Sequence, residues 1–122
     1  MEANSRIFVA GATGLAGSAL VRQLRARGYG QLLLPGRGDL DLTDQPAVRH
    51  FFAEQRPEYV FLAAAKVGGI LANDTYPADF IYGNLMIQTT VIHQAYLSGV
   101  KRLLFLGSSC IYPKLAAQPM GE

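Results

Sequence analysis

The sequence has little cysteine, little net charge and no long apolar run, and each shortage excludes a class of protein. Cys110 is the only cysteine in 122 residues, so no disulfide can form within the chain and a reducing compartment fits best. The net charge is +2 with both signs dispersed, which gives no reason to expect nucleic acid or an anionic membrane as a partner. No apolar run approaches the roughly 20 residues of a membrane helix, and the first residues show no secretory leader. We therefore expect a cytoplasmic protein that is not associated with a membrane.

Short apolar runs typical of strands alternate along the sequence with segments that have the periodicity of helices. Half of the residues are hydrophobic and 16% are charged, as in one globular domain with a substantial core. Short apolar, β-branched or aromatic runs predict strands at 6–10, 31–34, 59–65 and 102–109. Helical periodicity separates them, which predicts βαβ units with parallel strands. The expected fold class is α/β, a doubly wound parallel sheet of the Rossmann type.

Three helices are expected between these strands. The first covers about 15–27 and places Leu15 and later apolar residues on its buried face. The second starts with Thr43 or Asp44 as its cap and carries a proline in its first turn. The third opens after a glycine-bearing loop and covers about 77–99.

A glycine run, GATGLAG, follows the first strand and opens the first helix, the context that a dinucleotide-binding fingerprint requires. Gly11 permits a tight turn, Gly14 lets the backbone approach a pyrophosphate, and Gly17 lets the helix pack closely on the strand. The free amides at the start of the helix would face the anion. We predict a cofactor-binding segment made of Gly11, Ala12, Thr13, Gly14, Leu15, Ala16 and Gly17. A plain strand-to-helix turn is the alternative.

The end of the second strand favours NADP over NAD. An acid there would accept the ribose 2′-hydroxyl of NAD, but Leu34 occupies the expected place and Arg37 follows. An arginine can pair with a 2′-phosphate through two parallel hydrogen bonds. A solvated loop arginine is the alternative. Asp41 and Leu42 are expected to give adenine a polar contact and an apolar wall, although Asp41 equally suits a simple turn.

The ends of the two later strands complete the predicted site. Three small residues after the third strand, Ala63, Ala64 and Ala65, leave room for a ribose or nicotinamide, or else serve tight helix–sheet packing. Lys66 is expected to be solvated rather than catalytic. The last strand ends in two hydroxyls and a thiol, and its expected cofactor contacts are Leu106, Gly107, Ser108 and Ser109. Cys110 is a catalytic candidate, with a buried structural cysteine as the alternative. No metal site is predicted.

Three segments, GATGLAGSAL, LAAAKVGGILANDTYPADFIYGN and LLFLGSSCIYPK, together resemble the extended short-chain dehydrogenase/reductase superfamily, and more narrowly the family of GDP-L-fucose synthases. The resemblance implies NADP(H) as cofactor and a GDP-sugar as substrate, GDP-4-keto-6-deoxy-D-mannose, which is epimerised at C3 and C5 and reduced at C4. It implies that Ser108 binds the C4 oxygen and that Cys110, with a histidine, moves protons at C3 and C5. It also implies a homodimer of the full-length enzyme, packed through the helix at 77–98.

The sequence departs from this family in two ways. Ala12 and Thr13 stand where some members carry a His-Arg pair, which leaves more of the 2′-phosphate binding to Arg37. The superfamily's Tyr-x-x-x-Lys pair is absent, because the two nearby tyrosines are followed at plus four by a valine and an alanine, and both histidines sit in helix patterns. We therefore expect 1–122 to be the incomplete, amino-terminal NADP-binding domain of a longer enzyme, without the substrate domain and inactive alone.

Two other functions remain open. One is another sugar-nucleotide epimerase or dehydratase of the same superfamily, whose members usually have no thiol at the position of Cys110. The other is a non-catalytic NADP-binding sensor module, which would have no use for Ser108 and Cys110 at the edge of the sheet.

Overall fold

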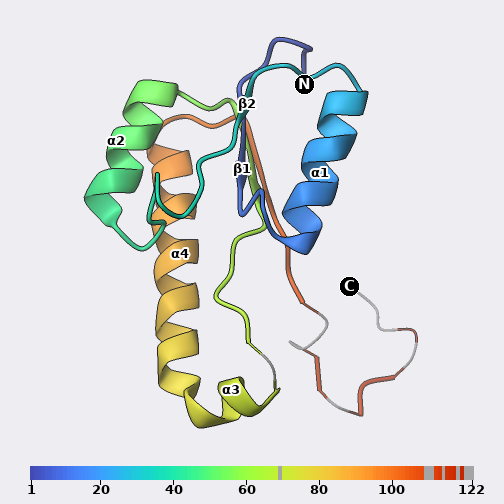
Figure 1. Cartoon of the computed structure of the whole chain (residues 1–122), viewed down its shortest axis with the longest axis vertical. Coiled ribbons are helices and arrows are strands. Elements are labelled where there is room, and N and C mark those ends of the chain that lie inside the picture. The colour runs from blue at the N-terminus through green and yellow to red at the C-terminus, as the bar shows by residue number, and fades with distance from the viewer. Residues whose placement is uncertain (69, 109–111, 114, 118, 120–122) are drawn as a thin grey trace.

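A parallel sheet lies at the centre of the molecule in a computed structural model that describes residues 1–68, 70–108, 112, 113, 115–117 and 119. Within these residues the strand order is β2-β1-β3-β4, and every pairing is parallel. The strands are β1 (Ile7–Ala10), β2 (Leu32–Leu33), β3 (Tyr59–Leu62) and β4 (Arg102–Phe105), and the helices are α1 (Leu15–Ala26), α2 (Gln45–Gln55), α3 (Ile70–Thr75) and α4 (Pro77–Leu97). Helix α1 covers one face of the sheet, and α2 and α4 cover the other (Figure 1). The predicted doubly wound α/β fold is confirmed.

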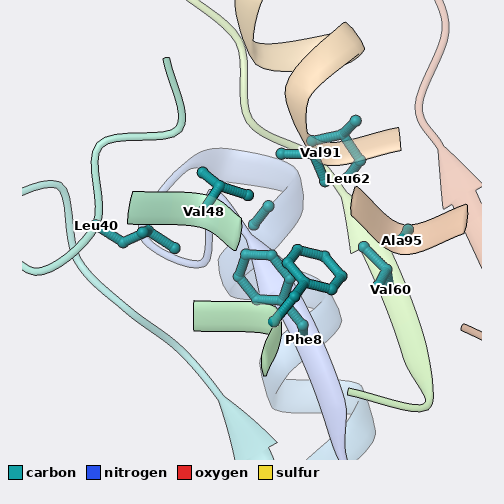
Figure 2. Packing of buried hydrophobic residues seen from close by; sticks show 9 residues of the cluster. Phe8, Leu40, Val48, Val60, Leu62, Val91 and Ala95 are labelled. Atoms are coloured by element: carbon teal, nitrogen blue, oxygen red, sulfur yellow. The ribbon is translucent and has the colours of Figure 1, made fainter. Parts of the chain in front are cut away.

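Strand β1 is buried on both faces, as its uninterrupted apolar run predicts. Alternate residues of the strand point to opposite sides, so each side packs against a different layer. Ile7 and Val9 contact α1 through Val21 and Leu24. The larger cluster lies between the sheet and helices α2 and α4 (Figure 2) and consists of Phe8, Ala10, Leu40, Val48, Phe52, Val60, Leu62, Val91 and Ala95. The central strand is therefore fixed from both sides, and the turn that follows it is held on a rigid support.

The strand register brings three loops to one edge of the sheet. Ala10 is paired with Leu62, and Leu62 with Phe105. The ladder continues for one residue, because Ala63 N–H donates to Ala10 O at 3.0 Å and Leu106 N–H donates to Leu62 O at 3.2 Å. The segments after β1, β3 and β4 therefore leave the sheet side by side, at the edge where ligands bind in folds of this kind.

The helix starts confirm one expectation and correct two. Asp44 is the cap of α2, since its Oδ1 accepts from Ala47 N–H at 3.0 Å. Leu15 was expected in the core but is 94% exposed, at the first position of α1. Helix α3 was not predicted, since six residues are too few to show a helical period. In the described ranges no helix is both long and apolar enough to cross a bilayer.

All four predicted strands are shorter in the structure, and the last two end well before their expected ends. The third was expected to reach Ala65 but ends at Leu62. Ala63 still donates its N–H to Ala10 O, and no further ladder bond follows it in the described residues. The fourth ends at Phe105 rather than at Ser109, which lies outside the described residues. In both places a continuous apolar run does not mark the point at which pairing stops.

The opposite edge of the sheet is tied together by Glu58. Its Oε1 accepts from Lys101 Nζ at 2.7 Å and its Oε2 accepts from the backbone N–H of Arg6 at 3.1 Å. The hydrogen bond from Lys101, followed by the one from Arg6, lowers the pKa of the Glu58 carboxyl, and the bond to Glu58 raises the pKa of Lys101. One carboxylate thus joins the starts of β1, β3 and β4.

We expect Glu58→Gln to flatten the loss of stability in acid. The Glu58 pKa is lowered by folding, so its contribution is present above the ordinary value of 4.5 and is lost as the pH falls below that value. The Lys101 pKa is raised, so its contribution is present below 10.5 and is lost as the pH rises above it. The urea midpoint measured from about pH 7 to about pH 3 checks the acid side. Asp74→Asn, at an exposed site on α3, is the control, and an identical acid profile for both variants would contradict the prediction.

Candidate functional site

A cleft of about 780 Å³ opens at the carboxyl edge of the sheet, between the segments that follow β1, β2 and β3. Eleven of the predicted cofactor residues line it: Gly11, Ala12, Thr13, Gly14, Leu15, Arg37, Asp41, Leu42, Ala63, Ala64 and Ala65. Helix α4 closes one side with Gly83 and Ile87. The volume is in the range of small-molecule sites.

Two of the three glycines in the turn are required by the fold itself. Gly11 has φ +85°, and a Cβ on it would lie 2.8 Å from backbone atoms of Ala64. A Cβ on Gly17 would lie 2.0 Å from Gly11 O, which no small adjustment can relieve. These two positions confirm the expected tight turn and the close packing of helix on strand.

Gly14 differs, because the protein leaves room for a side chain there. The nearest atom to an added Cβ is Gly11 O at 3.4 Å, an ordinary contact, and the backbone has φ −73°, which any residue adopts. Gly14 is exposed and lines the cleft. No packing requirement of the described chain explains a glycine at this position, whereas close approach of a ligand to the backbone does.

The start of α1 has the electrostatics of an anion site. Its cap, Gly14, offers no side-chain hydrogen bond, and the first turn contains no acidic residue. Helix α2 is different, since Asp44 caps it. The first amides of α1 therefore keep their hydrogen-bonding capacity and the positive end of the helix dipole, and they do so at the mouth of the cleft. These features fit a phosphate group.

The loop after β2 carries the polar groups at the other end of the cleft. Asp39 Oδ2 accepts from Gly36 N–H at 2.9 Å and braces the turn from which the exposed Arg37 extends. Asp41 Oδ1 accepts from the hydroxyl of Thr43 at 2.7 Å and from its backbone N–H at 2.9 Å. These two bonds lower the pKa of Asp41, so its carboxyl stays ionised well below neutral pH.

The loop after β3 is held by a contact that no sequence pattern predicts. The Asn84 side chain on α4 accepts from Lys66 N–H at 2.7 Å and donates to Lys66 O at 2.9 Å. The Lys66 ammonium lies 5.2 Å from the centre of the Phe80 ring, and a Cβ on Gly83 would lie 3.2 Å from Lys66 Cδ. Lys66 is exposed, as expected, yet it also lines the cleft.

The remaining predicted residues are not brought into the cleft. Gly17 is buried beneath the turn, and Ala16 is exposed beside it without lining the cleft. The segment Leu106–Ser108 follows β4 at the same edge of the sheet and is exposed, but it does not line the cleft either. Ser109 and Cys110 lie outside the described residues. A direct role for these residues stays a prediction.

Comparison with known proteins identifies one family and relatives that share one name. The profile of the NAD dependent epimerase/dehydratase family matches residues 7–122. A putative GDP-L-fucose synthase 2 of Arabidopsis thaliana is 62% identical over 100% of the chain and 37% of the relative, and the GDP-L-fucose synthase of Escherichia coli K12 is 60% identical over 96% and 36%. The chain thus spans little more than a third of the length of these curated relatives.

Solved structures agree with this comparison. A GDP-D-glycero-L-gluco-heptose synthase from Campylobacter jejuni, solved in the presence of NADPH, has a TM-score of 0.95 at 50% identity, over 99% of the chain and 35% of that structure. A GDP-L-fucose synthetase from Naegleria fowleri bound to NADP has a TM-score of 0.85 at 28% identity, over 99% and 36%. The architecture around the cleft is therefore shared with proteins that bind this dinucleotide.

Proposed function

The chain belongs to the NAD dependent epimerase/dehydratase family, and from this premise we propose that it binds NADP(H) as the cofactor domain of an enzyme making GDP-L-fucose. The observation that carries the proposal is the cleft at the carboxyl edge of the sheet. Gly14 lines this cleft without a side chain, and it directly precedes the start of α1, where no side chain caps the helix. The names of the relatives support the product, GDP-L-fucose, which would be made from the substrate that the resemblance implies, GDP-4-keto-6-deoxy-D-mannose. The single cysteine supports a reducing, cytoplasmic setting.

Each part of the cleft suits one part of the dinucleotide. The amides at the start of α1 would hold the pyrophosphate, and Gly14 would let it approach. Arg37 would pair with the 2′-phosphate, with Asp41 and Leu42 at the base. The alanines after β3 would lie against the nicotinamide half. When bound, the cofactor supplies the hydride for reduction of the 4-keto group.

The residues after β4 would serve the sugar. Ser108 would donate a hydrogen bond to the C4 oxygen, which becomes negatively charged as the carbonyl is reduced. Cys110 would act with a histidine, as the resemblance implies, to move the protons at C3 and C5, which are acidic because both carbons adjoin the ketone. One of the two groups would remove the proton from one face of the sugar, and the other would return a proton to the opposite face, which inverts each centre. The unperturbed thiol pKa of Cys110, about 8.5, is near the working pH. The proton donors of the reduction would come from residues outside this chain.

A homodimer is part of the proposal. Helix α4 exposes a row of large apolar side chains: Ile81, Tyr82, Leu85, Ile92, Tyr96 and Leu97. A helix that is apolar on more than one face is typical of one covered by a further element. We propose that a second copy of the same enzyme covers this face.

A GDP-heptose is the second candidate substrate. The C. jejuni GDP-D-glycero-L-gluco-heptose synthase is 50% identical to the chain, which lies between the 28% of the N. fowleri fucose enzyme and the 60% of the E. coli GDP-L-fucose synthase. Both substrates would present a GDP group and a 4-keto sugar, so the cofactor cleft would serve either one. The part of the enzyme that holds the sugar decides between them.

A chimaera tests the proposal. We expect an E. coli GDP-L-fucose synthase whose matching segment is replaced by this chain to oxidise NADPH in the presence of GDP-4-keto-6-deoxymannose, while the isolated chain does not.

Two variants of this chimaera test the residues after β4. Ser108→Ala should slow the reduction by about 100-fold, as the loss of one oxyanion donor does. Cys110→Ser should abolish deuterium exchange at C3 and C5, with Thr89→Ala as the control. A chimaera that binds NADPH but does not oxidise it with GDP-4-keto-6-deoxymannose would contradict the assignment of this sugar nucleotide as the substrate.

A further inference from the structure

Thr43 lies in the cleft with no assigned role. The capping of α2 is done by Asp44, whose side chain accepts from Ala47 N–H at 3.0 Å, so the Thr43 hydroxyl is not used as a helix cap. It donates instead to Asp41 Oδ1 at 2.7 Å, and its backbone N–H donates to the same oxygen at 2.9 Å. A further bond, from Asp44 N–H to Asp41 O at 3.1 Å, closes the turn.

These contacts fix the orientation of one carboxylate. Both donors bind Oδ1, and within the described part of the chain no hydrogen bond reaches Oδ2. Asp41 and Thr43 both line the cleft, beside Leu42 and on the same loop as Arg37. Oδ2 is therefore held as an acceptor before any ligand arrives, and the same bonds lower the pKa of the carboxyl and keep it ionised.

We propose that Thr43 is a positioning residue that orients the Asp41 carboxylate so that the cleft selects a 6-amino purine over a 6-oxo purine. The inference rests on the proposed function, since it takes the ligand to be a dinucleotide whose base lies at this loop. An ionised carboxylate is only an acceptor, so it binds the exocyclic amine of adenine. It opposes the oxygen that hypoxanthine carries at the same position, and this repulsion gives the discrimination.

The test compares NADPH with reduced nicotinamide hypoxanthine dinucleotide phosphate in binding titrations of the chain. The wild type is expected to prefer NADPH by about tenfold, the value of one hydrogen bond to a charged group. Thr43→Val should reduce this preference to about threefold or less, since only the backbone donor remains. Thr43→Ser keeps the hydroxyl and should restore the wild-type ratio. Thr89→Ala removes a hydroxyl bonded within α4 and should leave the ratio unchanged.

A second variant separates orientation from charge. In Asp41→Asn the donors of Thr43 require the amide oxygen at the position of Oδ1, which turns the NH₂ group toward the base. The preference should then invert in favour of the 6-oxo purine, and adding Thr43→Val should weaken the inversion because the amide is free to flip. A merely structural Thr43 would change both affinities equally and leave every ratio intact.

The outcomes distinguish this inference from the proposed function. NADPH binding with an unchanged ratio in Thr43→Val, or an Asp41→Asn variant without inversion, would overturn the role of Thr43 alone. A wild type that binds neither dinucleotide would overturn both proposals.

Discussion

Gly17→Ala is expected to prevent the chain from reaching a stable folded state. The new Cβ would lie 2.0 Å from Gly11 O, 2.7 Å from Gly11 C and 3.0 Å from Ala12 Cα. All three are backbone atoms of a tight turn. The turn cannot yield, because it packs closely against the loop after β3: a Cβ added at Gly11 would lie 2.8 Å from the backbone of Ala64. Overpacking of this kind costs on the order of 3 kcal/mol or more, a large part of the stability of a small domain.

Circular dichroism and urea unfolding measure this effect, and Gly14→Ala is the matched control. The same methyl group at Gly14 meets only Gly11 O at 3.4 Å, so the urea midpoint should stay near the wild-type value. NADPH affinity should nevertheless fall by at least about tenfold, because the methyl group occupies the path of the pyrophosphate. A stable Gly17→Ala variant would contradict the packing argument, and a Gly14→Ala variant with unchanged affinity would contradict the ligand argument.

Arg37→Leu is expected to remove the preference for NADPH over NADH. A charge-assisted pair with the 2′-phosphate contributes about 1.5–3 kcal/mol, so NADPH affinity should fall about 10- to 100-fold while NADH affinity changes little. Thr13 is exposed in the cleft and carries no charge that would substitute for Arg37. Titrations of both dinucleotides check this, with Arg27→Leu at the end of α1 as the control. Equal losses for NADPH and NADH would contradict the assignment of Arg37.

Much of the fold and of the cleft follows from periodicity and topology. Continuous apolar runs identify buried parallel strands, and parallel strands joined by helices bring their carboxyl ends to one edge. That rule alone places the glycine turn, the alanines after β3 and Arg37 close together, as the structure does. The roles of Gly11 and Gly17 were also predictable, since a strand that turns directly into a helix leaves no room for side chains there.

The parts that escaped prediction depend on contacts between distant positions. Asn84 holds Lys66 across 18 residues of sequence, and neither residue stands out in a helical or strand pattern. Leu15 is exposed although it falls on the helical spacing of buried residues, because that spacing does not record which turns of a helix are covered by other elements. Thr43 suits a helix cap as well as Asp44 does, and only the structure shows that its donors go to Asp41.

Binding of NADPH and NADH to the wild-type chain, followed by isothermal titration calorimetry, tests the central claim most directly. The cleft predicts saturable binding of one NADPH per chain, at least about tenfold tighter than NADH because of the 2′-phosphate. A chain that is folded by circular dichroism but binds neither dinucleotide would contradict the claim that this cleft is a cofactor site.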